Sequence, residues 1–385
     1  MRPSPLPLPG PDALAASRAL TALIEREIGE GGGWIPFSRY MELALYAPGL
    51  GYYAGGSVKL GAPGDFVTAP EMGALFAQVL ARQVAPLLEQ GGEILEFGAG
   101  SGALAAALLG ALARLGVELP WYLILEPSAE LAARQRACLE AAGLAARVGW
   151  IDHLPQRVRG VVIANEVVDA MPVHALAWTA EGVFERGVKL NGTALAWAEC
   201  PAQGAALAAA QAIAIELPPS GRYESEINLF GRAWMRALAR TVEAGALLVI
   251  DYGFPAREYY HPQRSMGTIM CHYRHHAHGD PFFHPGLQDI SAHVDFSALA
   301  HAATDAGLEL LGYAPQASFL VNCGITDVLA QTDPSDTARY APLAAQANRL
   351  LSPAEMGELV KVLAVGRGVP GPLLGFTRGE RSRTL

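Results

Sequence analysis

Three glycines that follow a short apolar run constrain this chain more than any other feature. Residues 94–102 read Ile-Leu-Glu-Phe-Gly-Ala-Gly-Ser-Gly, with glycines at positions Gly98, Gly100 and Gly102. Because glycine has no Cβ, such a backbone can adopt positive φ and approach a ligand closely before a helix near Ala103 presents free N–H groups. The pattern predicts a strand that turns into a helix around a nucleotide-like ligand. A glycine-rich turn without a ligand is the alternative.

The spacing of these glycines and the preceding acid distinguish between ligands. A dinucleotide fold has the pattern G-x-G-x-x-G, whereas Ala103 stands here where the third glycine would fall. Glu96, directly before the loop, suits a ligand with an ammonium group better than one with a pyrophosphate. S-adenosylmethionine has such a group. We therefore expect Glu96 and the three glycines to bind this cofactor.

Polar residues close four further predicted strands. Because ligands of open α/β sheets bind at the carboxyl ends of the strands, these residues extend the predicted cofactor site to Glu126, Asp152 and Asn165. Glu126 can accept hydrogen bonds from both ribose hydroxyls. The strands and the residues that follow them are Trp121–Leu125 before Glu126, Arg147–Ile151 before Asp152-His153, Gly160–Ala164 before Asn165-Glu166, and Ala246–Ile250 before Asp251-Tyr252-Gly253.

The end of the chain predicts how the sheet closes. After a helix from Phe296 to Ala306, the stretches Leu308–Tyr313 and Ser318–Cys323 have the pattern of an antiparallel hairpin. This ending favours a methyltransferase sheet over an all-parallel dehydrogenase sheet. Ser352-x-x-Glu355 has the pattern of a capping box and predicts a helix to about Val365.

Seven motifs in order resemble one family of class I methyltransferases, which includes the mitochondrial complex I assembly methyltransferase and its bacterial relatives. The resemblance implies an α/β, Rossmann-like class I methyltransferase sheet with an N-terminal helical cap and inserted antiparallel strands. It also implies S-adenosyl-L-methionine as cofactor and, for the mitochondrial member, methylation of an arginine on a complex I subunit. The motifs are Phe37-x-x-Tyr40-Met41, Leu45-Tyr46-x-Pro48-x-x-Gly51-Tyr52-Tyr53, Gly64-Asp65-Phe66-x-Thr68-x-Pro70-Glu71, Glu96 to Gly102, Asn165-Glu166-x-x-Asp169-Ala170-Met171-Pro172, Asp251-Tyr252-Gly253, and Gly286-x-x-Asp289-Ile290-x-Ala292-His293-Val294-Asp295-Phe296.

The order of these patterns predicts three consecutive segments. Residues 1–88 form a helical cap with a lid loop from Pro48 to Pro70, in which Thr68 and Glu71 match a capping box. Residues 89–330 form the cofactor-binding core, and residues 331–385 a helical extension. Insertions at 173–220, with a hairpin turn at Asn191-Gly192, and at 254–295 are expected to determine substrate specificity.

Composition excludes several classes of protein. Apolar residues make up 51% of the 385 residues and charged residues 17%, which indicates a folded chain. The formal charge of -9 provides no basic surface for nucleic acid. The longest apolar run, Ala103 to Ala113, is shorter than a membrane span. Four dispersed cysteines and no visible transit peptide predict a bacterial cytoplasmic protein, or a mitochondrial matrix protein in a eukaryote. An oligomer is compatible with the sequence.

Eight of the ten histidines lie between His261 and His301. A zinc site is one interpretation, but the adjacent His275 and His276 would point apart and the spacing matches no structural zinc site. A loop in which the imidazoles hydrogen-bond to backbone and carboxylates is favoured, and no metal is predicted. No G-x-S-x-G motif supports a nucleophilic serine.

Methyl transfer requires alignment of the acceptor with an activated methyl group. An arginine acceptor must also be held by carboxylates that orient one nitrogen and take a proton. Glu166 and Asp169 are the predicted catalytic acids; the alternative for Asp169 is a helix N-cap before Met171-Pro172. The sequence leaves three hypotheses: a protein arginine methyltransferase, a methyltransferase for a small molecule or another protein residue, and a non-catalytic assembly factor that binds the cofactor.

Overall fold

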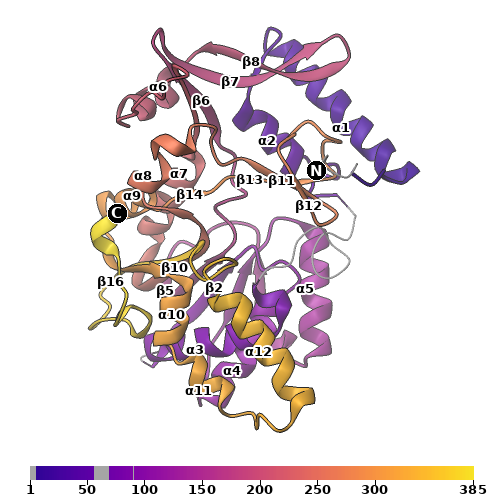
Figure 1. The fold of residues 1–385 in the computed structure, drawn as a ribbon. Helices are drawn as coiled ribbons and strands as arrows, with labels where there is room; N and C mark the ends of the chain where they lie inside the picture. Colours follow the sequence, from indigo (N-terminus) through magenta and orange to yellow (C-terminus); the bar gives the residue numbers. More distant parts are fainter. Residues whose placement is uncertain (1–5, 56–68, 90) are drawn as a thin grey trace. The chain divides into compact units, whose positions relative to one another are not determined.

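The computed structural model describes residues 6–55, 69–89 and 91–385, which form two compact units (Figure 1). The first unit comprises Met1–Phe66, Asp169–Gly231 and Ala256–Asp295. The second comprises Val67–Val168, Arg232–Pro255 and Phe296–Leu385. The chain therefore passes between the units several times. The predicted division at residues 88 and 330 stays a prediction.

The second unit is built on a mixed sheet with the strand order β15-β16-β10-β5-β2-β3-β4. The strands from β10 to β4 are parallel to one another, whereas β16 is antiparallel to both of its neighbours. This is the predicted α/β, Rossmann-like architecture. The strands are β2 (Glu93–Phe97), β3 (Tyr122–Leu125), β4 (Val148–Ile151), β5 (Val158–Asn165), β10 (Val242–Phe254), β15 (Glu309–Pro315) and β16 (Val360–Arg367).

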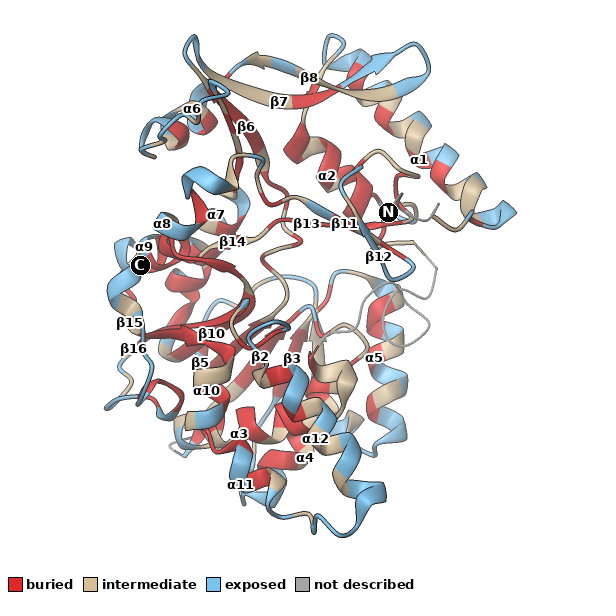
Figure 2. Cartoon of the chain, in the orientation of Figure 1, coloured by how far each residue is buried: buried red, intermediate tan, exposed pale blue. Residues whose placement is uncertain are grey.

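The core of this unit lies between the sheet and its helices. Strands β2, β5 and β10 are buried along most of their length (Figure 2), as expected for parallel strands covered on both faces. The helices are α3 (Leu75–Leu88), α4 (Ala103–Arg114), α5 (Ala129–Ala141), α9 (Phe296–Asp305), α10 (Gln316–Asn322), α11 (Ile325–Leu329) and α12 (Thr337–Leu351), with short 3-10 turns η1 (Ala69–Met72), η2 (Ala145–Arg147), η4 (Leu374–Phe376) and η5 (Ser382–Thr384). Helix α7 (Leu229–Thr241) leads into β10.

Two predictions for the end of the chain are wrong. The stretch Ser318–Cys323 lies almost entirely in helix α10, where Phe319 and Leu320 are buried, rather than in a strand. The segment after Ser352 contains no helix to Val365; it leads into β16, which supplies the antiparallel strand between β15 and β10. The sheet thus closes with an antiparallel strand, as predicted, but one from another segment.

The first unit is organised around antiparallel strands. Its larger sheet has the order β1-β7-β6-β9, with β8 paired to β7, and a smaller one the order β12-β11-β13. Asn191 pairs with Ala194 around Gly192 and Thr193, so the predicted hairpin turn is confirmed. The strands of these two sheets are β1 (Ile35–Pro36), β6 (His174–Thr179), β7 (Gly182–Asn191), β8 (Ala194–Pro201), β9 (Arg222–Ile227), β11 (Met270–Tyr273), β12 (His276–His278) and β13 (Asp289–Ser291), whereas the short strand β14 (Val294–Asp295) is in neither sheet.

Two N-terminal helices pack within the first unit, α1 (Pro11–Glu30) and α2 (Phe37–Tyr46). The buried residues Leu20, Ile24 and Ile28 recur every four positions of α1, which is the spacing of one apolar helix face. The unit also contains α6 (Gly204–Gln211), α8 (Ala256–Tyr259) and η3 (Pro262–Arg264). Most of the predicted lid loop, and Thr68 of the predicted capping box, lie outside the described residues.

Candidate active site

The glycine loop between β2 and α4 has the backbone that the sequence predicts. Gly98, Gly100 and Gly102 have φ values of 57°, 55° and 88°. A Cβ at Gly98 would lie 3.3 Å from Cγ2 of Val167, and one at Gly102 would lie 3.1 Å from Cα of Gln135. Gly102 is the N-cap of α4 and provides no side-chain cap. The first turn of α4 thus keeps backbone N–H groups that a ligand can use.

Glu96 is buried beside this loop. Its carboxylate accepts a hydrogen bond from the Tyr122 hydroxyl at 2.8 Å. Burial raises the pKa of Glu96 to about 7, although the Tyr122 hydrogen bond lowers it. A cationic partner would favour the charged form of such a carboxyl. Its predicted contact with the ammonium group of the cofactor stays a prediction.

Glu126, at the end of β3, is held by two residues of the second unit. Its Oε1 accepts the backbone N–H of Ser128 at 2.9 Å, and its Oε2 accepts Nε2 of Gln135 at 3.0 Å. Burial raises the pKa of Glu126, while these two hydrogen bonds lower it. The carboxylate is therefore fixed in orientation at the strand end, as a ribose-binding acid requires.

Asp152 is placed differently from the other predicted cofactor residues. It follows β4, its side chain is 82% exposed, and its Oδ1 lies 2.6 Å from Nδ1 of His153. The hydrogen bond with His153 lowers the pKa of Asp152. No described contact joins it to the glycine loop or to Glu126. Its role in cofactor binding stays a prediction.

Asn165 and Glu166 form a strained turn at the end of β5. Glu166 has φ 52°, and its backbone N–H donates to the carbonyl of Ile250 at 2.8 Å. Its Oε1 accepts Nδ2 of Asn165 at 3.3 Å. A non-glycine residue in the left-handed region costs about 1–3 kcal/mol and persists only where its surroundings determine it.

Asp251, within β10, supplies these surroundings. Its Oδ2 accepts the backbone N–H groups of Val167 and Val168, and its Oδ1 accepts the N–H of Tyr252. Asp251 has no exposed surface. This carboxylate therefore fixes the turn that carries Glu166.

The turn η1 lies against both of these loops. The carboxylate of Glu71 accepts a hydrogen bond from the Ser101 hydroxyl within the glycine loop. The backbone N–H of Ala69 lies 3.4 Å from Oε1 of Glu166. From its motif, Glu71 could be either a capping residue or a functional one. The structure adds it to the candidate site.

Asp169 belongs to the first unit. Its backbone carbonyl accepts the N–H of Ala292 at 2.9 Å, and the residues that follow it form a turn. No helix begins there, so the alternative of an N-cap before Met171-Pro172 is wrong. Its predicted catalytic role stays a prediction.

The first unit also gathers tyrosines around a buried acid. Asp289 is 6% exposed, and its Oδ1 accepts the Tyr53 hydroxyl at 2.8 Å. The Tyr53 ring stacks on Tyr46, with ring centroids 5.6 Å apart. The Tyr46 hydroxyl donates to the carbonyl of Ala170, the residue after Asp169. Burial and the charge of Asp289 raise the pKa of Tyr53, which keeps its hydroxyl protonated.

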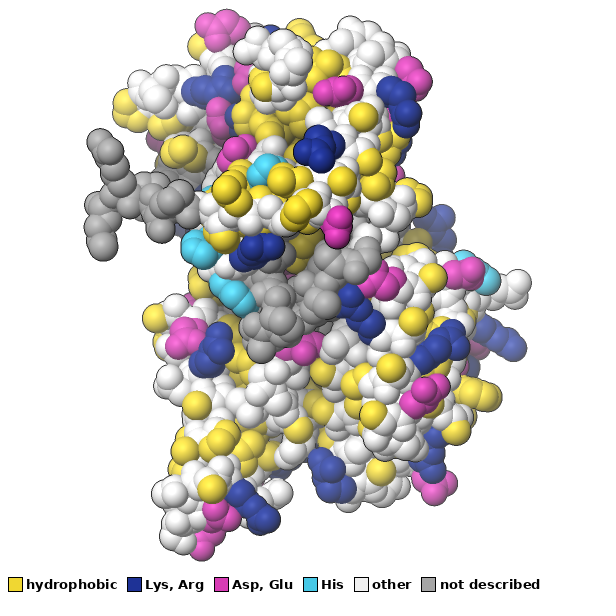
Figure 3. All heavy atoms as spheres, turned by 90° about the vertical axis from the view of Figure 1, so that its right-hand side faces the viewer, with side chains coloured by type: hydrophobic (Ala, Val, Ile, Leu, Met, Phe, Trp, Pro, Cys, Tyr) yellow, Lys and Arg dark blue, Asp and Glu magenta, His cyan; other side chains and the backbone are white. Residues whose placement is uncertain are grey.

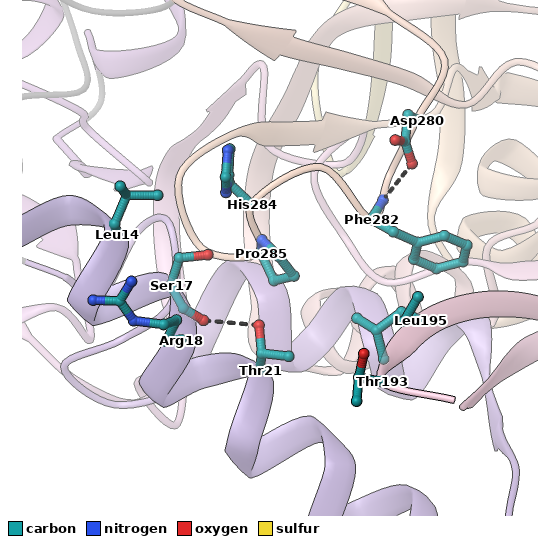
Figure 4. Close-up of a pocket in the computed structure, with 11 residues that line it drawn as sticks. Leu14, Ser17, Arg18, Thr21, Thr193, Leu195, Asp280, Phe282, His284 and Pro285 are labelled. Carbon is teal, nitrogen blue, oxygen red and sulfur yellow. Dashed lines mark hydrogen bonds between the residues drawn. The ribbon is translucent and has the colours of Figure 1, made fainter. Parts of the chain in front are cut away.

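An open cavity of about 530 Å³ lies elsewhere in the first unit (Figure 4). Helix α1, the start of β8 and the 280–285 loop line it, and it contains none of the predicted site residues. On the face shown in Figure 3, the described Lys and Arg side chains are interspersed with Asp and Glu rather than gathered in one basic patch. Of the helices that the structure describes, none is both long and apolar enough to cross a membrane.

The described histidines form no recognisable metal centre. Within residues 6–55, 69–89 and 91–385, no group of three or more His, Cys, Asp or Glu side chains is placed to hold an ion. Instead, Nδ1 of His276 lies 2.7 Å from the carbonyl of Arg274, and the N–H of Asp280 donates to Nδ1 of His278.

Three features define a class I methyltransferase. They are a sheet with one antiparallel strand beside its edge, a glycine loop with left-handed backbone, and an acid held in one orientation after the next strand. The family model described as "Putative S-adenosyl-L-methionine-dependent methyltransferase" matches residues 75–314, and the chain belongs to this family. Membership confirms S-adenosyl-L-methionine as the cofactor. The left-handed glycines and the oriented Glu126 carboxylate fit this molecule.

Solved and curated relatives extend the likeness over nearly the whole chain. A solved protein from Burkholderia thailandensis, described as a "likely methyl transferase" and bound to S-adenosyl-homocysteine, is 54% identical, with a TM-score of 0.95, and the match covers 99% of this chain and 100% of that one. "Protein arginine methyltransferase NDUFAF7, mitochondrial" from Danio rerio is 28% identical, over 86% of this chain and 83% of its own length. Its Drosophila melanogaster homologue is 26% identical, over 90% and 86%.

Gln135, which donates to Glu126 and to the carbonyl of Gly100, is a neighbour of the candidate site that sequence reasoning missed. Gln135 lies in α5 with no exposed surface, on the face that also buries Leu131 and Leu139. A single polar residue on an otherwise apolar helix face is the signal that could have identified it.

Proposed function

We propose that this methyltransferase acts on an arginine side chain of a protein, and that this protein is a subunit of a respiratory NADH-quinone oxidoreductase. The likeness to relatives named as protein arginine methyltransferases supports the arginine specificity. The family resemblance read from the seven sequence motifs supports the choice of subunit.

The cofactor supplies an activated methyl group, so the protein has to orient and desolvate the acceptor. A guanidinium is planar and cationic and stays protonated in water. A carboxylate that forms a charge-assisted hydrogen bond to it fixes one nitrogen toward the methyl group and can take the proton that is released.

The observation that carries the proposal is the strained backbone of Glu166. Glu166 follows β5 with a φ of 52°, and the next residue, Val167, has its Cγ2 3.3 Å from where a Cβ of Gly98 would lie. Strain of this kind is characteristic of residues held for function. Glu166 is the proposed catalytic carboxylate, and Asp169 remains the second candidate.

The tyrosines of the first unit favour a cationic acceptor. Tyr46 is 39% exposed and stacks on Tyr53, which donates to Asp289. An aromatic face beside a carboxylate attracts a guanidinium through cation–π and charge-assisted contacts. A neutral small-molecule acceptor would gain no cation–π contact.

The test uses extracts of cells that lack this protein. The purified chain is incubated with the extract and radiolabelled S-adenosylmethionine, and the oxidoreductase subunits are analysed by mass spectrometry. We expect protein label and a methyl mass on one arginine of one subunit, which is absent without the chain. Label in the small-molecule fraction would replace the proposal by the second hypothesis. Cofactor binding without label anywhere would favour a non-catalytic assembly factor.

A further inference from the structure

Both N–H groups of the Gln135 side-chain amide donate hydrogen bonds, and its oxygen accepts one. These bonds connect three parts of the candidate cofactor site. Its Nε2 donates to Oε2 of Glu126 at 3.0 Å and to the carbonyl of Gly100 at 3.2 Å. Its Oε1 accepts the indole N–H of Trp150 at 3.0 Å. The side chain thus joins the end of β3, the glycine loop and β4.

The partners also fix which way the amide points. An indole nitrogen can only donate, and a carboxylate and a carbonyl can only accept. With the amide reversed, the oxygen of Gln135 would face two acceptors and its nitrogen would face a donor. Only one orientation satisfies all three partners, and Arg136 further holds Trp150 by stacking 4.4 Å from its ring centroid.

The glycine loop is packed against the same residue. A Cβ at Gly102 would lie 3.1 Å from Cα of Gln135 and 3.3 Å from its carbonyl oxygen. The loop and α5 are therefore in direct contact through backbone atoms. A change in the Gln135 side chain alters the carboxylate of Glu126 and the loop carbonyl together.

We propose that Gln135 is a positioning residue for cofactor affinity, which orients Glu126 for the ribose hydroxyls and fixes Gly100 of the glycine loop. The proposal concerns the cofactor alone and does not depend on the identity of the methyl acceptor. It assigns Gln135 no contact with the cofactor.

The primary test compares Gln135→Leu with Gln316→Leu by calorimetry with S-adenosylhomocysteine and by thermal unfolding of the ligand-free protein. Gln316 is also a fully buried glutamine on a helix of the second unit, where its Nε2 donates to the carbonyl of Leu350. We expect Gln135→Leu to raise the dissociation constant by about tenfold to a hundredfold, because Glu126 loses a charge-assisted hydrogen bond. Gln316→Leu should lower the melting temperature and leave the dissociation constant within about twofold.

A double-mutant cycle separates positioning from general loosening. If Gln135 acts through Glu126, then Gln135→Leu should weaken binding much less when Glu126 is already alanine. Full additivity of the two effects would overturn the proposal, as would a folded Gln135→Leu protein of unchanged affinity.

If Gln135→Leu does not fold, Trp150→Phe tests whether Gln135 is a positioning residue. This milder variant keeps an aromatic ring and removes the N–H that orients the amide, together with part of the indole. We expect the dissociation constant for S-adenosylhomocysteine to rise severalfold, with less effect in the Glu126→Ala background. Unchanged affinity of a folded Trp150→Phe protein would overturn the proposal.

Discussion

Oδ2 of Asp251 lies 2.9 Å from the backbone nitrogen of Val168, and this contact fixes the turn that carries Glu166. The same oxygen accepts the N–H of Val167 at 3.2 Å. Both oxygens of Asp251 accept hydrogen bonds from backbone N–H groups. This residue therefore supports the proposed catalytic carboxylate and is not expected to bind the acceptor itself.

Replacement of Asp251 by asparagine should loosen this turn. The variant keeps the shape but loses the charge and one acceptor oxygen, so the free energy of unfolding should fall by about 1–3 kcal/mol. Methyl transfer should fall further than this loss of stability explains. Urea unfolding and turnover measure the two effects. Asp327→Asn, at an exposed ion pair with Arg82, should stay within about 0.5 kcal/mol. Equal behaviour of the two variants would contradict the assigned role.

Two left-handed glycines of the second unit allow a matched test of the glycine loop. Gly102 and Gly116 have φ values of 88° and 75°, but a Cβ at Gly116 would meet no atom within 4 Å. Gly116→Ala should lower the free energy of unfolding by only about 1–2 kcal/mol, which is the cost of a left-handed backbone at a residue with a Cβ. Gly102→Ala should also push α5 away at Gln135 and weaken binding of S-adenosylhomocysteine about tenfold or more.

Calorimetry on both glycine variants provides the measurement, and thermal unfolding provides the control for stability. If Gly102→Ala and Gly116→Ala bind the ligand equally well, then the close approach between the loop and α5 has no bearing on the cofactor.

The buried Glu96 predicts a pH dependence of stability. Its pKa rises from an ordinary value of 4.5 to about 7 in the folded chain, chiefly through burial. The folded chain therefore binds more protons than the unfolded chain between these values, so this contribution to stability is full below about pH 4.5 and is lost as the pH rises through 7. Glu96→Gln should remove the loss.

Urea unfolding of the ligand-free protein from pH 4.5 to 8 tests this sign. The free energy of unfolding of Glu96→Gln relative to the original chain should increase by about 3 kcal/mol over this range. If the free energy of unfolding of Glu96→Gln relative to the original chain instead decreases as the pH rises, then Glu96 is held charged in the folded chain.

The parts of this structure that follow local patterns could be predicted from the sequence. The strand ends at Glu126, Asp152 and Asn165 lie where apolar runs stop. Ser318–Cys323 could not be assigned, since a short buried apolar run has the same composition in a helix as in a strand. The strand that pairs with β15 proved to be β16, whose place in the sheet depends on contacts with β10 and β15 that are distant in sequence.

The site was predictable to the same extent. Glycines and acids beside strands have recognisable motifs, and Glu166 was predicted in this way. Gln135 carries no motif because its importance depends on three partners from separate elements. The left-handed conformation of Glu166 depends likewise on Asp251, more than eighty residues later in the chain.

Glu166→Gln should separate cofactor binding from chemistry. The amide keeps the shape of the side chain but removes the charge that is proposed to hold the guanidinium. Turnover should fall roughly 100-fold or more, while the dissociation constant for S-adenosylhomocysteine changes little. Glu243→Gln, at an ion pair with Arg159 in the same unit, is the control. A parallel loss of affinity and turnover would assign Glu166 to the cofactor instead.

Asp289→Asn tests the acceptor side of the proposal in the first unit. Asparagine can still accept the Tyr53 hydroxyl, but it no longer attracts a cation, so kcat/KM for the protein acceptor should fall about tenfold or more. Affinity for S-adenosylhomocysteine should be unchanged. Asp280→Asn, at an exposed carboxylate of the same unit that accepts the N–H of Phe282, should leave both quantities unaltered. Steady-state methylation of the isolated subunit gives the answer: an unaltered kcat/KM in Asp289→Asn would remove Asp289, and with it the paired tyrosines, from recognition of the acceptor.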